Sequence, residues 1–213
     1  MFSILQTSTK SVNKRFMSEP QKTVSAAAME AEWQEIQAAQ QNPARFRPLY
    51  ERYYEPIFRF VFRRTADSDL SADLCSQVFL KALQRLESYQ FRGVPFSAWL
   101  FRIASNEVAQ HYRQNSQKRT VSVEENTLGD VAEEMDIDGE IWQVEDLVNV
   151  LDTLKPAELE LIELRFFEQR PFKVIAEILG ITESNAKVKT YRILERLKKR
   201  LQGQKTKWNR DGR

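Results

Sequence analysis

The sequence predicts an all-α protein built from two helical domains, joined by a flexible acidic linker. The N-terminal domain is expected to be a three-helix-type bundle, and the C-terminal domain to contain a helix-turn-helix. Three observations lead to this prediction. Apolar residues recur at three- and four-residue spacing in two separate stretches, a polar segment divides these stretches, and a glycine turn followed by a helix cap falls near residue 180. A chain of 213 residues is long enough for each half to bury its own core.

Composition argues against several classes of function. There is one histidine, His111, and one cysteine, Cys75, so metal sites and His-based nucleophilic catalysis would lack their usual residues. No phosphate-binding loop is present, and no apolar run approaches the ~20 residues that span a bilayer. We therefore expect no enzymatic activity, metal or cofactor. The lone Cys75 is expected to be structural, in a reducing compartment.

Residues 1–42 are expected to form an N-terminal extension that is partly disordered and becomes helical near 26–41. The basic stretch 1–17 faintly resembles a transit peptide. A start codon assigned too early explains the same stretch more simply, and Met1, Met17 and Met29 all remain open as the true start.

Residues 43–116 are expected to form the first domain. Pro43 opens its first helix, and Pro56 is expected to kink or interrupt it because proline lacks an N–H. Ser68 or Asp69 is the expected N-cap of the second helix, and a third helix is expected over about 97–115, after a loop over 89–96. The apolar positions of the second helix are Leu70, Leu74, Val78, Leu80, Leu83 and Leu86.

Charge is segregated along the second half of the chain. Residues 120–154 hold eleven acidic residues and no Lys or Arg, whereas residues 185–213 hold eleven basic residues against two acidic ones. We expect 117–141 to be a linker without apolar periodicity, 142–202 to be the second domain and 203–213 to be a basic tail. The basic C-terminal end indicates a polyanionic partner, unless it is only a solvated helix face.

Residues 171–201 have the anatomy of a helix-turn-helix. Pro156 and Pro171 both read as helix openers. Gly180 ends the first short helix and Thr182 caps the second. The phase of the second helix places a mixed set of side chains outward, as a major-groove reader requires: Asn185, Lys187, Val188, Tyr191 and Arg192. Phosphate contacts are expected from Lys198, Lys199 and Arg200. The alternative is a helical hairpin in a protein-binding bundle.

A second cluster interleaves aromatic residues with Arg and Asn around the third helix. Such a mixture suits single-stranded nucleic acid, because bases stack on rings while cations follow the backbone. For Trp99 a core position is favoured over contact with a base, although it remains among the candidates. The candidate residues are Phe91, Arg92, Phe96, Trp99, Arg102, Asn106, Tyr112 and Arg113.

Together these segments resemble the extracytoplasmic-function (ECF) branch of the sigma-70 family of RNA polymerase sigma factors. Residues 49–54 (LYERYY), 72–80 (ADLCSQVFL) and 95–106 (PFSAWLFRIASN) are similar to that family's region 2. Residues 151–158 (LDTLKPAE) and 175–185 (IAEILGITESN) are similar to its region 4. The sequence departs from the family in two places. No carboxylate lies beside Gln77, and Thr190 stands where the family usually has Leu or Ile.

The resemblance implies a role for each part. Region 2 would dock on the coiled coil of the largest polymerase subunit through Asp73, Gln77, Lys81 and Arg85. The loop and third helix would capture flipped bases of the minus-ten element, and the recognition helix would read the duplex minus-thirty-five element. The implied partners are core RNA polymerase, promoter DNA in duplex and single-stranded form, and an anti-sigma factor. The implied location is the bacterial cytoplasm, with no membrane insertion.

Two other functions remain open from the sequence. A stand-alone helix-turn-helix transcription regulator explains the C-terminal domain, but it gives no purpose to the aromatic cluster. A nuclease or recombinase needs clustered carboxylates for metal, whereas the acidic residues here gather in the expected linker. The sequence does not specify the promoter, the regulon or the inducing signal.

Overall fold

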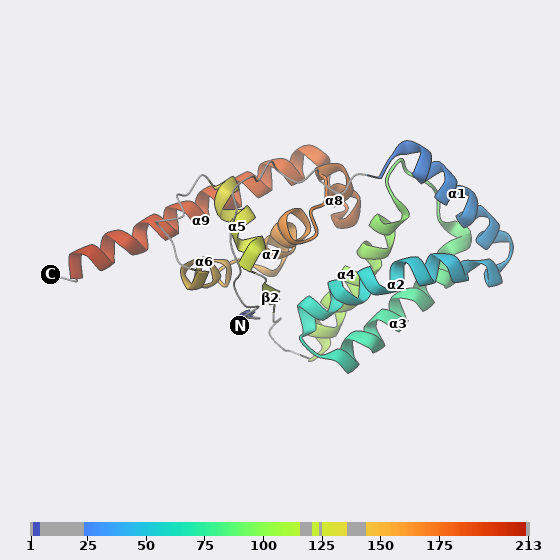
Figure 1. Cartoon of the computed structure of the whole chain (residues 1–213), viewed down its shortest axis with the longest axis horizontal. Helices are drawn as coiled ribbons and strands as arrows, with labels where there is room; N and C mark the ends of the chain where they lie inside the picture. The colour runs from blue at the N-terminus through green and yellow to red at the C-terminus, as the bar shows by residue number, and fades with distance from the viewer. Residues whose placement is uncertain (1, 5–23, 116–120, 124, 136–143, 212–213) are drawn as a thin grey trace, which may run out of the picture.

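A computed structural model of the chain describes residues 2–4, 24–115, 121–123, 125–135 and 144–211. It confirms the all-α prediction in both halves (Figure 1). The N-terminal half consists of α1 (Ala26–Gln41), η1 (Pro43–Phe46), α2 (Arg47–Thr65), α3 (Ser68–Arg85), η2 (Leu86–Ser88) and α4 (Phe96–Asn115). The C-terminal half contains α5 (Glu125–Glu134), α6 (Val144–Leu151), α7 (Pro156–Ile162), η3 (Glu163–Phe167), α8 (Phe172–Leu179) and α9 (Glu183–Asp211). Two three-residue strands, β1 (Phe2–Ile4) and β2 (Val121–Val123), pair in parallel.

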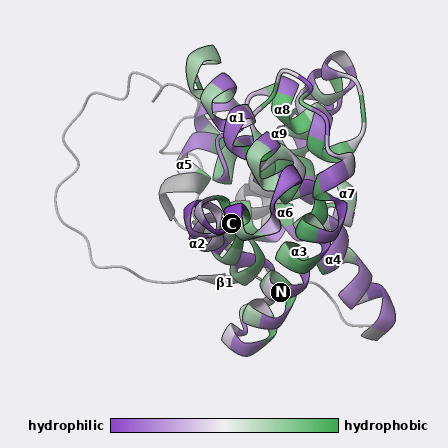
Figure 2. Cartoon of the chain, turned by 90° about the vertical axis from the view of Figure 1, so that its right-hand side faces the viewer, coloured by the Kyte–Doolittle hydropathy of each residue, from purple (hydrophilic) through white to green (hydrophobic). Residues whose placement is uncertain are grey.

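Helices α2, α3 and α4 pack together as the N-terminal bundle. Each is amphipathic, with a hydrophobic and a hydrophilic side (Figure 2). The residues at their contact are fully buried, among them Ile57, Phe60, Val78 and Leu100. Most of the apolar positions read from the sequence therefore lie on the core face of these helices.

Two local expectations in this bundle differ from the structure. The interruption that was one of the two outcomes expected at Pro56 is absent, because helix α2 continues through this residue; proline keeps a helical φ, and its missing N–H removes only one backbone bond. The N-cap of α3 is Asp67, whose carboxylate accepts a 3.0 Å hydrogen bond from the amide of Leu70. An Asp at this position satisfies an amide at the helix start that has no partner within the helix, and it displaces the predicted caps Ser68 and Asp69 into the first turn.

The described part of the acidic segment over 125–135 is helical and packed. It contains α5, and Leu128, Val131, Ala132 and Met135 are all buried. Their spacing of three, one and three residues is a helical stripe that the density of carboxylates concealed. The expectation that 117–141 lacks apolar periodicity was therefore wrong for this part of it.

The helix-turn-helix forms as predicted. Gly180 ends α8 with a left-handed backbone (φ 66°), a conformation that glycine adopts without steric cost. The Thr182 hydroxyl accepts a 3.2 Å hydrogen bond from the amide of Asn185 at the start of α9. Pro156 is in the first turn of α7, and Pro171 directly precedes α8, so both prolines begin helices.

The two halves of the chain pack against each other, chiefly through α4 and α8. Arg64 on α2 forms an ion pair at 2.7 Å with Glu163 on η3, and both side chains are 2% exposed. The guanidinium of Arg170 lies 4.4 Å from the centre of the Phe101 ring on α4. Because a buried charge is costly without its partner, the Arg64–Glu163 ion pair favours this packing of the two halves.

Candidate nucleic-acid and polymerase interfaces

A cavity of about 350 Å³ lies beside the start of α4. It brings together four residues of the predicted minus-ten cluster: Arg92, Trp99, Arg102 and Asn106. Its other lining residues come from α3, from the 86–94 segment, from α4 and from α8: Arg85, Ser88, Tyr89, Gln90, Val94, Ile103 and Glu177. Cationic, amide and aromatic groups thus meet in one cavity, as capture of an unstacked base requires.

Glu177 is a part of this cavity that the sequence did not predict. It belongs to α8, about 70 residues beyond the cluster, and its Oε1 lies 3.3 Å from Nη1 of Arg92 and 3.7 Å from Nη1 of Arg102. A carboxylate of the second domain therefore occupies the cationic side of the cavity. No spacing pattern signals a contact of this kind, because it arises only when α4 and α8 pack together.

The aromatic residues of the cluster divide into supporting and accessible ones. Phe96 is 1% exposed, and its ring packs against Tyr53, Tyr89 and Trp99. A base cannot stack on a fully buried ring, so the assignment of Phe96 to base contact is corrected to support. Trp99 is half-buried against the same rings and lines the cavity. Burial raises the pKa of the Tyr89 hydroxyl to about 12, which keeps this side chain neutral.

Three further predicted residues lie outside the cavity. Phe91 is half-buried and stacks on Trp33 of α1, with ring centres 6.1 Å apart. The Tyr112 hydroxyl donates a 2.6 Å hydrogen bond to the carbonyl of Arg64, which ties α4 to α2. Arg113 is exposed near the end of α4.

The predicted docking face on α3 is partly as expected. Asp73, Gln77 and Arg85 are exposed, and Arg85 also lines the cavity. Lys81 instead reaches α4, where its Nζ lies 2.5 Å from the nearly buried carboxylate of Glu107. Because its ammonium is paired with Glu107, Lys81 is less available for docking than the other three residues of the predicted face.

Two leucines on α3 face outward rather than into the core. Leu80 is 56% exposed and Leu83 is 38% exposed, so not every apolar position of this helix belongs to the core. They lie beside the exposed polar residues of the same helix, and an apolar patch next to polar groups is typical of a protein-binding surface.

The outer face of α9 agrees with the predicted phase. Asn185, Lys187 and Arg192 are exposed, and Val188 and Tyr191 are 43% and 50% exposed. The opposite side is buried through Ala186, Thr190, Ile193 and Leu197.

Thr190 fits its buried position because its hydroxyl donates a 2.9 Å hydrogen bond to the carbonyl of Ala186. A polar side chain is satisfied in this way where the family usually has an aliphatic one. The departure from the family pattern therefore leaves the helix phase unchanged.

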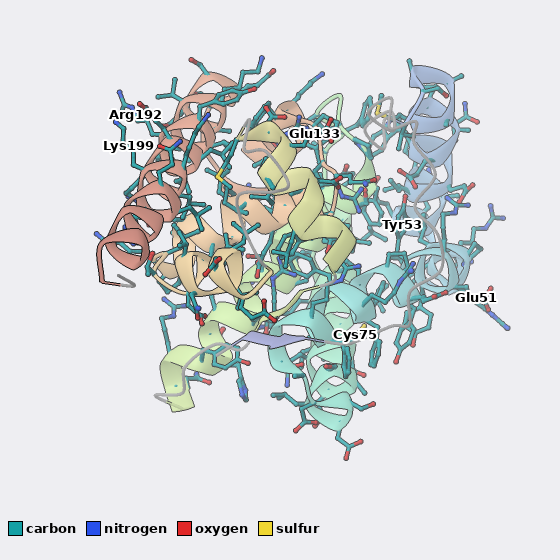
Figure 3. All side chains as sticks on the ribbon, turned by 60° about the vertical axis from the view of Figure 1, so that its left-hand side comes forward. Glu51, Tyr53, Cys75, Glu133, Arg192 and Lys199 are labelled. Carbon is teal, nitrogen blue, oxygen red and sulfur yellow. The ribbon has the colours of Figure 1, made fainter. Side chains whose placement is uncertain are left out.

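The basic residues further along α9 differ in availability. Lys199 is 74% exposed and pairs only loosely with Glu195, at 3.2 Å, and it projects from the helix together with Arg192 (Figure 3). The guanidinium of Arg200 donates to the hydroxyl of Thr153 within the same domain. Lys198 is half-buried.

Within the described part of the chain, no group of three or more His, Cys, Asp or Glu residues could hold a metal ion. None of the described helices is both long and apolar enough to cross a membrane. Cys75 is buried and unpaired with another cysteine. Burial raises the pKa of its thiol to about 12, which opposes formation of a reactive thiolate.

Comparisons with known proteins all indicate the same family. A model described as Sigma-70 region 2 matches residues 49–118, and one described as Sigma-70, region 4 matches residues 150–199. The chain is 31% identical over 159 residues to the RNA polymerase sigma factor YlaC of Bacillus subtilis (strain 168), covering 72% of this chain and 90% of that relative. It is 28% identical over 154 residues to the ECF RNA polymerase sigma factor BldN of Streptomyces coelicolor, covering 71% of this chain and 58% of that relative.

A solved structure shares the fold. That of CnrH in complex with the cytosolic domain of CnrY is 20% identical, has a TM-score of 0.51, and the match covers 79% of this chain and 95% of that chain. The chain therefore belongs to the sigma-70 family of RNA polymerase sigma factors, in its ECF branch. Matches to both regions favour this function over a stand-alone helix-turn-helix regulator, which would need only the second.

Proposed function

We propose that this sigma factor binds core RNA polymerase through α3 and selects promoters with two separate surfaces. Residues 43–116 unpair and read the minus-ten element, and residues 142–202 read the minus-thirty-five element. The observation that carries the proposal is the presence in one chain of a cavity suited to single-stranded bases and an exposed helix suited to the major groove. Residues 117–141 connect the two parts, and residues 203–213 form a basic tail.

Docking on the polymerase would combine polar and apolar contacts. Asp73, Gln77 and Arg85 supply hydrogen bonds and charge on the exposed face of α3. Leu80 and Leu83 supply apolar area that becomes buried on contact. The leucines compensate for the absence of a carboxylate beside Gln77.

Capture of the minus-ten strand would use the cavity beside α4. Trp99 offers an aromatic ring, Asn106 offers hydrogen bonds, and Arg92 and Arg102 attract phosphate. Base–aromatic stacking is worth about 1–3 kcal/mol per base, which offsets the few kcal/mol that extrusion of a base costs. Both arginines pair with Glu177 while α8 lies against α4. DNA binding therefore requires this carboxylate to move away from the cavity.

Recognition of the minus-thirty-five element would use the outer face of α9. Asn185, Lys187 and Arg192 can reach base edges or phosphates in the major groove, and Val188 and Tyr191 supply apolar contact. Lys199 follows on the same helix as a phosphate contact, with smaller contributions from Lys198 and Arg200.

The same proposal covers the remaining properties of the protein. It has no catalytic activity of its own, because the polymerase performs the chemistry. It works in the bacterial cytoplasm, with the polymerase and the chromosome. A protein partner, which we take to be an anti-sigma factor, is consistent with CnrH, a protein of the same fold that has been solved in complex with the cytosolic domain of CnrY. The carboxylates of the acidic segment can act as a nucleic-acid mimic in cationic polymerase channels.

The test is in vitro transcription with purified core RNA polymerase on a fragmented genomic library. The wild-type protein is expected to produce new, discrete start sites. These starts should be lost in Asn106→Ala and Arg192→Ala, and retained in Glu30→Ala, which changes an exposed residue on α1. A folded protein that neither binds polymerase nor creates start sites would refute the proposal.

A further inference from the structure

Helix α1 lies outside the region 2 match, which begins at residue 49, yet its residues Glu32, Trp33 and Gln40 contact the segment 86–96, named here the minus-ten loop. At the start of the loop, Nε2 of Gln40 donates hydrogen bonds of 2.9 Å to the carbonyls of Leu86 and Tyr89. In the middle, the Trp33 ring stacks on Phe91. These contacts fix two points of a segment that has little secondary structure of its own.

Glu32 fixes the third point, where the loop joins α4. Its side chain is nearly buried, and its Oε2 accepts a 3.1 Å hydrogen bond from the backbone N–H of Phe96. Phe96 is the first residue of α4, so this amide has no partner within the helix. A carboxylate at a helix N-terminus both satisfies such an amide and interacts favourably with the helix dipole.

The other oxygen of Glu32 is held from α2. The Tyr53 hydroxyl donates a hydrogen bond to Oε1, and Nη1 of Arg52 lies 3.4 Å from the same atom. Burial, followed by this hydrogen bond, raises the pKa of the Tyr53 hydroxyl above its ordinary value, so Tyr53 remains a donor throughout the pH range in which the protein works. One carboxylate thus joins α1, α2 and the first turn of α4.

We propose that α1 is a positioning element for the minus-ten reading loop, and that Glu32 is its central positioning residue. Glu32 does not contact DNA. It holds the amide of Phe96, and with it the turn from which Trp99 and Arg102 enter the cavity. A base-reading group must be held within a fraction of an ångström to discriminate, so loosening of this turn should weaken base preference before it weakens binding. This inference rests on the proposed minus-ten role of the loop.

The first measurement is hydrogen exchange of the backbone amides in the free protein, which does not depend on any transcription activity. In Glu32→Ala, the amides of 89–99 are expected to exchange roughly tenfold to hundredfold faster, because a hydrogen bond to a charged group is lost. Those of α2 and α3 should keep their protection. Glu32→Gln retains a carbonyl oxygen for the Phe96 amide and should recover most of the protection. The control Glu30→Ala changes an exposed residue of the same helix and should leave the exchange unaltered. Unaltered exchange at 89–99 in Glu32→Ala would overturn the proposal.

The second measurement is base preference, taken from start sites mapped on the genomic library with the variant holoenzymes. Glu32→Ala should flatten the preference at the minus-ten positions and leave the minus-thirty-five motif intact, with partial recovery in Glu32→Gln. A merely structural role would reduce the number of starts without changing either motif, and this result would also overturn the proposal. If wild-type protein creates no starts at all, the proposed function fails, while the exchange measurement still decides whether Glu32 holds the loop.

Discussion

Replacement of Glu177 by Gln tests whether the second domain competes with DNA for the minus-ten cavity. The substitution keeps the size of the side chain and removes the charge that pairs with Arg92 and Arg102 at 3.3 and 3.7 Å. The arginines are 65% and 43% exposed, and Glu177 is 23% exposed. Ion pairs of this exposure are worth about 0.2–1 kcal/mol each, so their joint loss amounts to about 0.4–2 kcal/mol.

This range corresponds to a gain of roughly two- to thirtyfold in affinity for single-stranded DNA, since about 1.4 kcal/mol changes an equilibrium constant tenfold. The assay is fluorescence anisotropy of the free protein with a labelled non-template oligonucleotide carrying the minus-ten element mapped by transcription. The gain should shrink at higher salt, because exposed pairs are screened.

The matched control is Glu55→Gln, which removes an exposed carboxylate that lies 3.8 Å from Arg59 on α2. It makes the same change in net charge away from the cavity. An equal gain in both variants would show that net charge alone is responsible. No gain in Glu177→Gln would show that this carboxylate does not compete with DNA.

Four further predictions concern Glu163, Cys75 and Lys199. Glu163→Ala should lower the free energy of unfolding in urea by about 3–5 kcal/mol, because it leaves the buried guanidinium of Arg64 without its carboxylate; a loss below about 1 kcal/mol would contradict the closed packing of the two halves. Because burial raises the pKa of Cys75 from 9.0 to about 12, alkylation at pH 8.5 should be at least about a hundredfold slower in the folded than in the unfolded protein. The same shift contributes stability that is complete below about pH 9 and is lost as pH rises toward about 12. In Cys75→Ala, the free energy of unfolding should therefore fall less steeply over this alkaline range than in the wild type. Lys199→Ala should reduce the slope of log K against log salt for duplex promoter binding by about 0.9, with a smaller change in Arg200→Ala, whose guanidinium is held within its own domain.

Local patterns in the sequence predicted the elements to which we assign the proposed function. The α9 phase was correct because its buried side repeats at helical spacing from Ala186 to Leu197. Gly180 and Thr182 marked the turn because each has a local conformational or capping requirement. The mixture of aromatic, arginine and amide side chains around α4 likewise followed from composition, and four of its members do line one cavity.

The patterns failed where a helix face has more than one use. Leu80 and Leu83 match the apolar spacing of α3, yet they remain exposed, because periodicity does not distinguish a core from a surface kept for a partner. The stripe of α5 was overlooked among carboxylates, although Leu128 and Val131 are buried. Phe96 has the chemistry of a base-stacking residue, but the surrounding rings enclose it.

By itself the sequence determined most of the helices, the helix-turn-helix with its turn at Gly180 and its cap at Thr182, and the chemical character of both proposed nucleic-acid surfaces, since each depends on residues within a few turns of one another. Only the tertiary structure decided which distant groups meet. Glu177 lies against Arg92, Glu32 holds the amide of Phe96, and Lys81 is paired with Glu107. Contacts of this kind depend on how whole helices pack, and a charged residue carries no local signal of whether its partner is solvent, DNA or a carboxylate from another helix.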